Sequence, residues 1–232
     1  MRTVNIAIDG PAGAGKSTIA KKLSKDLGYI YVDTGAMYRA LALFMLENDI
    51  DIDSEEAVRE ALDRVHIRIA HENGQQVVYL NERNVNGLIR TEQVSQMASK
   101  TSAIGAVREK LLSLQRDLAA SENVVMDGRD IGTHVLPDAQ VKIYLTASSA
   151  VRAKRRYNEH LEKGEPCDLD AIEKDIIERD HRDMNRAIAP LKQAEDAVYV
   201  DTSDMQLDEV IAELKVCIGP SRRPKQRDFV LA

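Results

Sequence analysis

The residues with the clearest chemical meaning form the loop 10–17, near the start of the chain. In order they are Gly10, Pro11, Ala12, Gly13, Ala14, Gly15, Lys16 and Ser17, followed by Thr18. This is a complete Walker A pattern, whose glycines let backbone N–H groups point inward around phosphate oxygens. Lys16 would reach the outer phosphates, and Ser17 would offer a hydroxyl to Mg²⁺. Because an apolar run precedes the loop and a helical segment follows it, we expect a nucleoside triphosphate site and not an ordinary glycine-rich turn.

A Walker A loop by itself leaves GTPases, ATPases, transporters and kinases open. The chain has no Asn-Lys-x-Asp motif of the kind that reads guanine, and no Leu-Ser-Gly-Gly-Gln signature of a transporter ATPase. Three further groups of residues narrow the choice toward a small-molecule kinase.

The first group is the segment 33–39, which reads Asp-Thr-Gly-Ala-Met-Tyr-Arg. It follows a predicted strand, and in a doubly wound sheet it would leave the carboxyl edge beside the Walker A loop, where an acceptor would bind. Arg39 could hold an acceptor phosphate through two parallel hydrogen bonds. An ordinary helix start, with Thr34 as its cap and Arg39 in solvent, explains this segment equally well.

The second group is the segment 124–130, Val-Val-Met-Asp-Gly-Arg-Asp, an apolar strand that ends in charged residues. Asp127 resembles the Walker B carboxylate that orients Mg²⁺ or its waters. Arg129 and Asp130 follow it at the end of the strand. We favour a functional role over a simple surface turn, because this edge of a parallel sheet is where ligands bind.

The third group is a concentration of arginines between residues 152 and 186. Its members are Arg152, Arg155, Arg156, Arg179, Arg182 and Arg186. Spacings of three and four residues predict that several guanidinium groups share a helix face, with the segment 164–166 as a flexible joint. Such a face is often only solvated. A hinged lid that carries arginines would suit phosphoryl transfer, which depends on positioning and on neutralising charge.

An alternation of strand-like and helical segments must position these residues, and it predicts a parallel α/β sheet flanked by helices. The expected strands are 3–9, 29–32, 123–127, 141–146 and 197–201, and the expected helices are 16–27, 36–47, 105–120, 148–163, 168–186 and 206–217. The segment 65–86 breaks this rhythm, because alternating runs at 65–69 and 77–80 flank an Asn73-Gly74 turn signal. With a third short strand at 84–86, it predicts a small inserted antiparallel sheet over the ligand crevice, followed by a polar helix at 92–101.

The composition limits the class of protein. The chain has 232 residues, 44% hydrophobic and 30% charged, with a formal net charge of −6. No apolar run approaches the roughly 20 residues that span a bilayer, and no signal peptide is recognisable. Cys167 and Cys217 lack metal-binding spacing. We therefore expect a cytoplasmic protein without membrane or nucleic-acid partners, and a disordered basic tail at 220–232.

Together these motifs closely resemble those of the bacterial cytidylate kinases, a branch of the nucleoside monophosphate kinases. The resemblance covers the chain up to about Gly219 and rests on Asp9-Gly10-Pro11 with the Walker A loop, on 33–39, on 127–130, and on Arg179-Asp180-His181-Arg182-Asp183 through Asn185-Arg186. It implies transfer of the γ-phosphoryl group of ATP to CMP or dCMP, with Mg²⁺ as cofactor. It also implies a monomer with one domain, 1–219, divided into a CORE (1–35, 105–150 and 168–219), an NMP-binding region with the insert (36–104) and an arginine-bearing LID (about 151–167).

The resemblance further implies roles for individual residues. The cytosine would be met by Ser99, Arg108 and Asp130, and the sugar by Arg179 and Asp183. The acceptor site around the phosphate would be lined by Thr34, Tyr38, Arg39 and Arg129, and the transfer would involve Lys16, Arg129, Arg156 and Arg186. The metal would be held by Ser17 and Asp127, directly or through water. The chemistry of the base supports part of this assignment. A carboxylate or hydroxyl can accept from the cytosine amine while an arginine donates to N3 and O2. Uracil would leave that acceptor unpaired, at a cost on the order of 1–3 kcal/mol.

Two alternatives remain open at this point. The chain could be another P-loop kinase of similar size that acts on UMP, AMP or a non-nucleotide acceptor. It could also be a binding module that senses ATP without transferring phosphate, although such a module has no need for arginines on the acceptor side. The identity of the molecule that accepts the phosphoryl group would reveal another kinase. The absence of any phosphorylated product would reveal a sensor.

Overall fold

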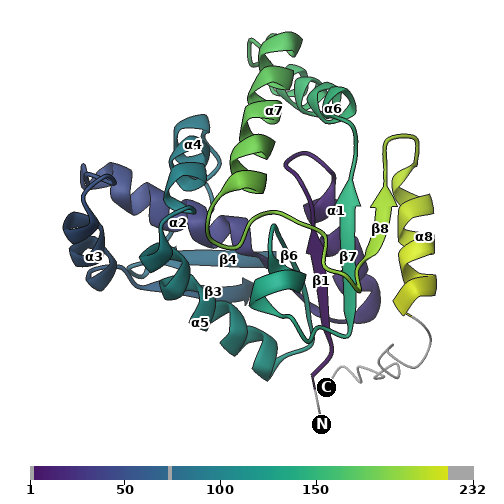
Figure 1. Cartoon of the computed structure of the whole chain (residues 1–232), viewed down its shortest axis with the longest axis horizontal. Helices are drawn as coiled ribbons and strands as arrows, with labels where there is room; N and C mark the ends of the chain where they lie inside the picture. The colour runs from purple at the N-terminus through teal and green to yellow at the C-terminus, as the bar shows by residue number, and fades with distance from the viewer. Residues whose placement is uncertain (1–2, 73–74, 219–232) are drawn as a thin grey trace.

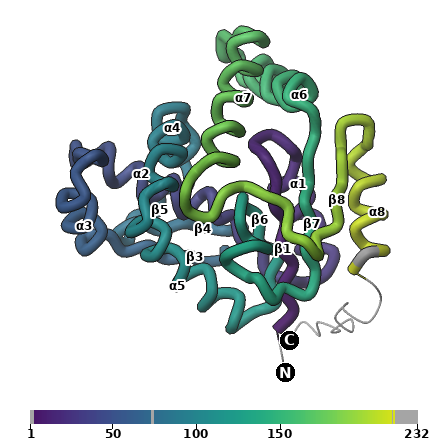
Figure 2. The backbone as a smooth tube through the Cα atoms, in the orientation of Figure 1, coloured from purple at the N-terminus to yellow at the C-terminus, as the bar shows by residue number. Residues whose placement is uncertain are grey.

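The computed structural model describes residues 3–72 and 75–218 (Figures 1 and 2). The strands are β1 (Asn5–Asp9), β2 (Ile30–Asp33), β3 (Ile67–Glu72), β4 (Gln75–Leu80), β5 (Arg83–Asn84), β6 (Val124–Gly128), β7 (Val141–Thr146) and β8 (Val198–Asp201). The helices are α1 (Lys16–Leu27), α2 (Thr34–Glu47), α3 (Glu55–Asp63), α4 (Glu92–Thr101), α5 (Gly105–Ser121), the π-helix η1 (Ile131–Val135), α6 (Ser149–Glu162), α7 (Leu169–Asn185) and α8 (Leu207–Ile218). The expected Asn73-Gly74 turn and the basic tail at 220–232 lie outside the described residues.

The larger sheet has the strand order β2-β6-β1-β7-β8, with all its pairs parallel, so the predicted parallel α/β sheet is confirmed. Its register decides where the site can form. Asp9, the last residue of β1, pairs with Gly128, the last residue of β6. Because both strands end at the same level, the Walker A loop and residues 129–130 leave the sheet side by side at its carboxyl edge.

Hydrophobic packing on both faces of this sheet explains why its central strands are largely apolar. Ile6 and Ile8 pack on one side with α1 and α8, while Ala7 packs on the other with α2 and α5. Strands buried on both faces read as continuous apolar runs and not as alternating ones. Each face therefore holds its helices in place, and the chemistry is left to the loops at the strand ends.

The inserted sheet has the order β3-β4-β5 and is antiparallel, as predicted. Its third strand is Arg83–Asn84, so it begins one residue and ends two residues before the expected strand at 84–86. The reason lies in the Asn86 side chain, which accepts a hydrogen bond from the N–H of Val78 at 2.9 Å and donates one to the carbonyl of Gln76 at 2.9 Å. The side chain thereby takes over backbone partners that a longer strand would have used.

The insert is tied to the end of β2, next to the predicted acceptor segment. The Gln76 side chain accepts from the N–H of Asp33 at 2.8 Å and donates to its carbonyl at 3.2 Å. His71 contacts the carbonyl of Tyr31 at 2.9 Å. An amide side chain that pairs with both backbone groups of one residue extends the sheet's hydrogen bonding. The insert is thus held beside the carboxyl edge, as expected for a structure over the ligand crevice.

Two helix predictions need correction. Helix α2 begins at Thr34 and not at residue 36, because Asp33 is its cap and accepts from the N–H of Ala36 at 2.9 Å. Thr34 is therefore not a cap, and its hydroxyl is free to donate to the carbonyl of Asp127 at 2.8 Å. The sequence analysis also missed α3, a short helix capped by Ser54. Its apolar spacing is only two turns long, too short to separate it from a loop by pattern alone.

Helices α6 and α7 form a hairpin that rises above the carboxyl edge of the sheet (Figure 1). This is the segment in which the lid was expected. Within the described residues, no helix combines the length and the apolar character that crossing a bilayer requires.

The structure predicts that Gly10 tolerates no side chain. Gly10 has φ 146°, and a Cβ there would lie 1.8 Å from the carbonyl oxygen of Leu145. We expect Gly10→Ala to lower the free energy of unfolding by at least about 2 kcal/mol, because strain and overlap add. The measurement is denaturant unfolding. The matched control is Gly87→Ala, since a Cβ at Gly87 meets nothing within 4 Å; equal stability of the two variants would contradict the prediction.

Candidate active site at the carboxyl edge of the sheet

The Walker A loop presents open backbone N–H groups at the start of α1. Gly13 and Gly15 adopt φ 76° and 86°, which turns the loop around the helix end. Gly15 occupies the cap position, makes no side-chain cap bond, and no acidic residue lies in the first turn. The first amides of a helix have no partners within it, and the helix dipole favours negative charge there. The loop is therefore built to receive an anion, as its sequence predicts.

Lys16 lies against this loop and is almost fully buried. Its Nζ donates to the carbonyl of Pro11 at 2.7 Å. Burial, together with the nearby Arg129 guanidinium, lowers the pKa of Lys16 to about 7. Phosphate oxygens would act in the opposite direction by favouring the charged amine. Lys16 is thus a buried amine whose charged form lacks a full counter-charge, at the position where triphosphate oxygens would lie.

Ser17 and Asp127, predicted from separate motifs, are in direct contact. The Ser17 hydroxyl donates to one carboxylate oxygen of Asp127 at 2.9 Å, and the Tyr31 hydroxyl donates to the other at 3.0 Å. Burial and the nearby Asp33 raise the pKa of Asp127 to about 6. A bound divalent cation would favour the ionised carboxylate. Tyr31 was missed by the sequence analysis, because within an apolar strand it looks like an ordinary core residue.

This pair of oxygen donors fits Mg²⁺. Carboxylate and hydroxyl oxygens are hard ligands, and Mg²⁺ at phosphate sites takes only one or two protein ligands alongside phosphate and water. Among the described residues, no group of three or more His, Cys, Asp or Glu side chains is arranged to hold a metal ion. A site of this composition would depend on the nucleotide to complete its coordination shell.

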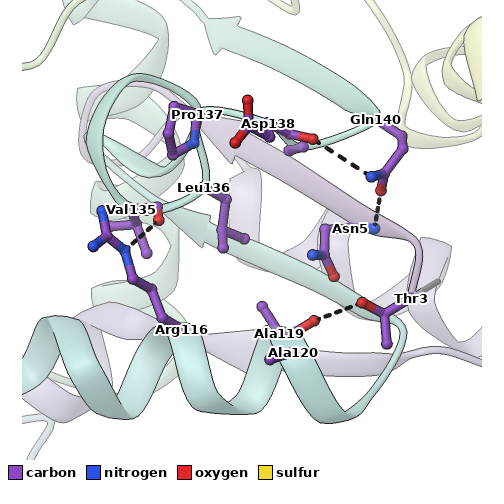
Figure 3. A pocket seen from close by; sticks show the side chains of 11 residues that line it. Thr3, Asn5, Arg116, Ala119, Ala120, Val135, Leu136, Pro137, Asp138 and Gln140 are labelled. Carbon is purple, nitrogen blue, oxygen red and sulfur yellow. Dashed lines mark hydrogen bonds between the residues drawn. The ribbon is translucent and has the colours of Figure 1, made fainter.

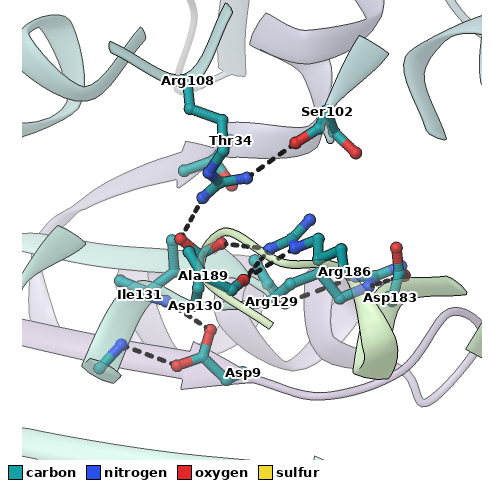
Figure 4. A network of polar contacts seen from close by, with 12 residues as sticks. Asp9, Thr34, Ser102, Arg108, Arg129, Asp130, Ile131, Asp183, Arg186 and Ala189 are labelled. Carbon is teal, nitrogen blue, oxygen red and sulfur yellow. Dashed lines mark hydrogen bonds and ion pairs between the residues drawn. The ribbon is translucent and has the colours of Figure 1, made fainter. Parts of the chain in front are cut away.

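Asp130 is the centre of a buried charge network (Figure 4). One carboxylate oxygen pairs with Arg108, and the other accepts from Arg186 at 3.1 Å. Arg108 also donates to the carbonyl of Ser102 at 3.2 Å, and its guanidinium lies 5.7 Å from the ring centroid of Tyr38. Arg108 is only 5% exposed, so its guanidinium group is a buried charge. Three residues predicted for the acceptor site thus meet in one cluster.

Arg186 is held from a second direction by the loop after α7. Its Nε donates to the carbonyl of Ala189 at 2.8 Å, and Ala189 adopts φ 47°, a conformation unusual for a residue with a Cβ. Burial and the neighbouring Arg108 lower the pKa of Arg186. A strained loop residue that supports a buried arginine is typical of functional sites.

A second charge cluster joins β6 to α7. Arg129 donates from Nε to Asp183 at 2.9 Å. Burial opposes ionisation of Asp183, but Arg129 and Arg179 hold the pKa of this carboxyl below its usual range. Burial and Arg129 together lower the pKa of Arg179 to about 10, and the Nε of Arg179 is buried without a hydrogen-bond partner. Two arginines therefore share one carboxylate, which leaves positive charge for a ligand to neutralise.

The segment 33–39 follows β2 at the same edge of the sheet, beside the end of β6. Arg39 pairs with Asp33 at 3.0 Å, while its own Nε is buried without a partner. Arg90, which the sequence analysis did not single out, lies 3.7 Å from the same carboxylate. No spacing or motif identified Arg90, because it reaches Asp33 only through the folding of the insert.

The arginines of α6 do not share one face toward a ligand, which corrects the sequence-based expectation. Arg152 is buried, pairs with Asp180 at 2.6 Å, and donates to the carbonyl of Ala12 at 3.1 Å. Arg155 donates to the carbonyl of Thr202 at 2.7 Å. Only Arg156 points across to α4, where it pairs with Glu92 at 2.7 Å. Arg152 and Arg155 anchor the start of α6 to the Walker A loop and to the residue after β8, because each donates to a backbone carbonyl there.

The structure has two hollows, one beside these charge clusters and one at the other end of the sheet. One, of about 350 Å³, lies between α4 and α7 and is lined by Ser99, His181, Asp183 and Arg186, among others. The Ser99 hydroxyl is buried there without a partner. The other, also about 350 Å³, lies at the amino ends of the strands around Thr3, and no predicted site residue lines it (Figure 3). The predicted residues therefore gather at one edge of the sheet only.

The comparisons with known proteins agree with this geometry. A family model described as cytidylate kinase matches residues 6–218. The chain belongs to the cytidylate kinase family. A cytidylate kinase of Lactobacillus gasseri is 49% identical over 95% of this chain and 96% of its own length, and one of Lactobacillus johnsonii is 50% identical over the same shares. One from Carboxydothermus hydrogenoformans is 48% identical over 93% of this chain and 97% of its own length. The resemblance stated from the motifs is thereby confirmed.

In this cytidylate kinase family member, two arginines of α6 provide a direct test of the charge geometry. Arg152→Met would leave Asp180 buried and unpaired, so we expect a loss of about 3 kcal/mol in the free energy of unfolding. Arg156→Met, one turn further along, breaks a more exposed pair and should cost less than about 1 kcal/mol. Urea unfolding of both variants measures the difference. Similar losses in the two variants would contradict the assignment of Arg152 as the anchor.

Proposed function

We propose that this chain transfers the γ-phosphoryl group of ATP to CMP or dCMP, giving ADP and CDP or dCDP. The observation that carries the proposal is the meeting of a Walker A loop with a surplus of arginines at one sheet edge, in a chain of the cytidylate kinase family. An ATP-binding loop needs no such arginines, whereas transfer between two anions does.

On the donor side, we assign residues 10–18 to ATP. The backbone N–H groups of the loop and Lys16 would hold the phosphates, and Ser17 and Asp127 would hold Mg²⁺, directly or through water. Their contact at 2.9 Å supports this assignment. The metal would supply neutralisation of the phosphate charge. Tyr31 would orient the Asp127 carboxylate through its hydrogen bond.

On the acceptor side, we assign Thr34, Tyr38, Arg39 and Arg129 to the phosphate of CMP and its surroundings, and Arg179 and Asp183 to the sugar. The unpartnered Nε atoms of Arg39 and Arg179 support this assignment, since a buried donor without a partner is costly unless a ligand satisfies it. Arg129 and Arg179 carry two positive charges, and the Asp183 carboxylate that they share carries only one negative charge. A bound phosphate would supply the negative charge that this one carboxylate does not.

For the base, we assign Ser99, Arg108 and Asp130. The unpartnered Ser99 hydroxyl supports a contact with the exocyclic amine. Arg108, fixed by Asp130 and by the carbonyl of Ser102, is a donor that could meet N3 and O2. Uracil would present a carbonyl where cytosine presents its amine and would leave a carboxylate acceptor without a donor.

The mechanism we propose needs no covalent intermediate and no strong general base, because a phosphate oxygen of CMP is already an anion. Lys16, Arg129, Arg156 and Arg186 would align the two phosphates and offset the repulsion between them. Asp127 would orient the metal shell and not accept a proton. Closure of the LID, about residues 151–167, would exclude water, which would otherwise compete as the acceptor.

The remaining parts of the proposal concern organisation. We assign residues 1–35, 105–150 and 168–219 to a CORE, 36–104 to an NMP-binding region and about 151–167 to a LID. The pair between Arg156 and Glu92, which joins the last two regions, supports a LID that can approach the acceptor. We further propose a cytoplasmic monomer whose partners are its nucleotides, with no nucleic-acid polymer among them.

The first test is ADP release from Mg-ATP with CMP, dCMP, UMP, AMP, GMP or no acceptor. We expect turnover mainly with CMP and dCMP, and a loss of at least about 100-fold in kcat for Lys16→Ala, because a preorganised cation would be removed. Activity mainly on another acceptor would favour a different P-loop kinase. ATP binding without a phosphorylated product would favour a sensor.

The second test separates the two substrates. Arg39→Ala should raise the KM for CMP by at least about tenfold, because one charge-assisted contact is lost, while the KM for ATP stays within about twofold. The control is Arg59→Ala, which removes an exposed arginine paired with Glu55 on α3. Equal effects of Arg39→Ala on both substrates would refute its assignment to the acceptor phosphate.

A further inference from the structure

We infer that Asp9 is a positioning residue for the acceptor site. Its carboxylate holds the first turn of η1 and thereby leaves Asp130 free to bind Arg108 and Arg186. This inference rests on the proposed function, since it assigns to Asp9 a role in selecting the acceptor. Asp9 itself touches neither Arg108 nor Arg186 and so acts through the backbone that carries Asp130.

The contacts of Asp9 are short and symmetrical (Figure 4). Oδ1 accepts from the N–H of Ile131 at 2.7 Å, and Oδ2 accepts from the N–H of Gly132 at 2.7 Å. Asp9 is 4% exposed, and burial raises the pKa of its carboxyl to about 6, while the two N–H groups act in the opposite direction. A buried carboxylate is costly without donors, so the two amides account for its presence at this position.

The cap position of η1 belongs to Asp130, yet its side chain makes no cap bond. An aspartate at the cap position would normally accept from the second or third N–H of its helix. The second of these, that of Gly132, is already occupied by Asp9, which also holds the N–H of Ile131, from a strand 122 and 123 residues away in the sequence. The Asp130 carboxylate can therefore turn into the site, where it is the acceptor for two buried arginines.

The surroundings of Asp9 are shaped for this contact. A Cβ at Gly132 would lie 3.3 Å from Oδ2 of Asp9 and 3.1 Å from Cδ of Lys142. The glycine thus leaves the space that the carboxylate needs to approach the backbone. The Lys142 amine is turned away and pairs with Asp196 at 2.9 Å.

Asp9 also joins the two halves of the site. It precedes Gly10 of the Walker A loop in the chain, and in the sheet it pairs with Gly128, two residues before Asp130. A single strand end therefore fixes both the start of the ATP loop and the loop that carries Arg129 and Asp130. Loss of the Asp9 contact should disturb the second loop selectively, because the P-loop retains its own helix and glycine geometry.

The experiment compares Asp9→Asn with the unaltered chain in steady-state kinetics on CMP, UMP and ATP. Asparagine keeps the shape but offers one acceptor oxygen, and its NH₂ group opposes the other backbone N–H. We expect the KM for CMP to rise about tenfold and the ratio of kcat/KM for CMP over UMP to fall about tenfold, with the KM for ATP within about twofold. Asp196→Asn is the control, since it alters the charge partner of Lys142 without touching η1.

The outcomes are distinct. If Asp9 has a merely structural role, Asp9→Asn lowers the melting temperature and lowers kcat equally with CMP and with UMP, while the KM values and the preference for CMP stay unchanged. That result would overturn the inference. If Asp9→Asn does not fold, Gly132→Ala decides, because its methyl group would lie 3.3 Å from Oδ2 of Asp9 and so crowd the same carboxylate; unchanged selectivity in that folded variant overturns the inference as well. If the unaltered chain itself shows no preference for CMP, the proposed function fails, and the inference fails with it.

Discussion

Burial of a cluster of arginine side chains is the constraint on which the rest of this structure depends. Guanidinium groups at the carboxyl edge of the sheet must lose water before any nucleotide arrives, and they keep their charge in doing so. Asp130 and Asp183 each hold two of them partly neutralised. The remaining positive charge and the unpartnered Nε of Arg179 stay available for a ligand. A site that were fully neutralised by its own carboxylates would have little affinity for phosphate.

The carboxylates can serve the arginines only because the backbone is satisfied by other means. Asp33 caps α2 with one oxygen and pairs with Arg39 through the other. Asp9 takes the free N–H groups of η1, which leaves the neighbouring Asp130 for side chains. Backbone capping and charge pairing thus compete for the same few acidic residues, and the parallel register of β1 and β6 determines which of them does which task.

The α6–α7 hairpin meets a related requirement. It must approach the phosphates without collapsing onto them, so it needs a fixed base and a less firmly bound remainder. Arg152 supplies the base through its buried pair with Asp180 and its bond to the Walker A loop. Arg156, one turn further along, has only the partly exposed Glu92 as a partner. The difference in burial makes one contact permanent and the other exchangeable, since exposed ion pairs are weak.

The Walker A loop, the alternation of strands and helices, and the inserted antiparallel sheet were predictable from the sequence, because short-range spacing encodes them. The family, and hence the set of acceptor residues to inspect, followed from motifs in a fixed order. What local pattern could not provide was the start of α2, the small helix α3, and the contributions of Tyr31 and Arg90. Tyr31 lies within an apolar strand, and Arg90 on an irregular segment, so neither carries a local signal.

The sequence by itself therefore determined the sheet, the phosphate loop and the identity of the charged residues near it. Only the tertiary structure decided which acid holds which arginine, that Arg152 anchors the hairpin, and that Asp9 holds η1. The physical reason is distance along the chain. Asp9 and Ile131 are 122 residues apart, and Arg129 and Asp183 are 54 apart. Such partners are chosen by strand order and register, which come from the packing of the whole sheet and leave no trace in local spacing.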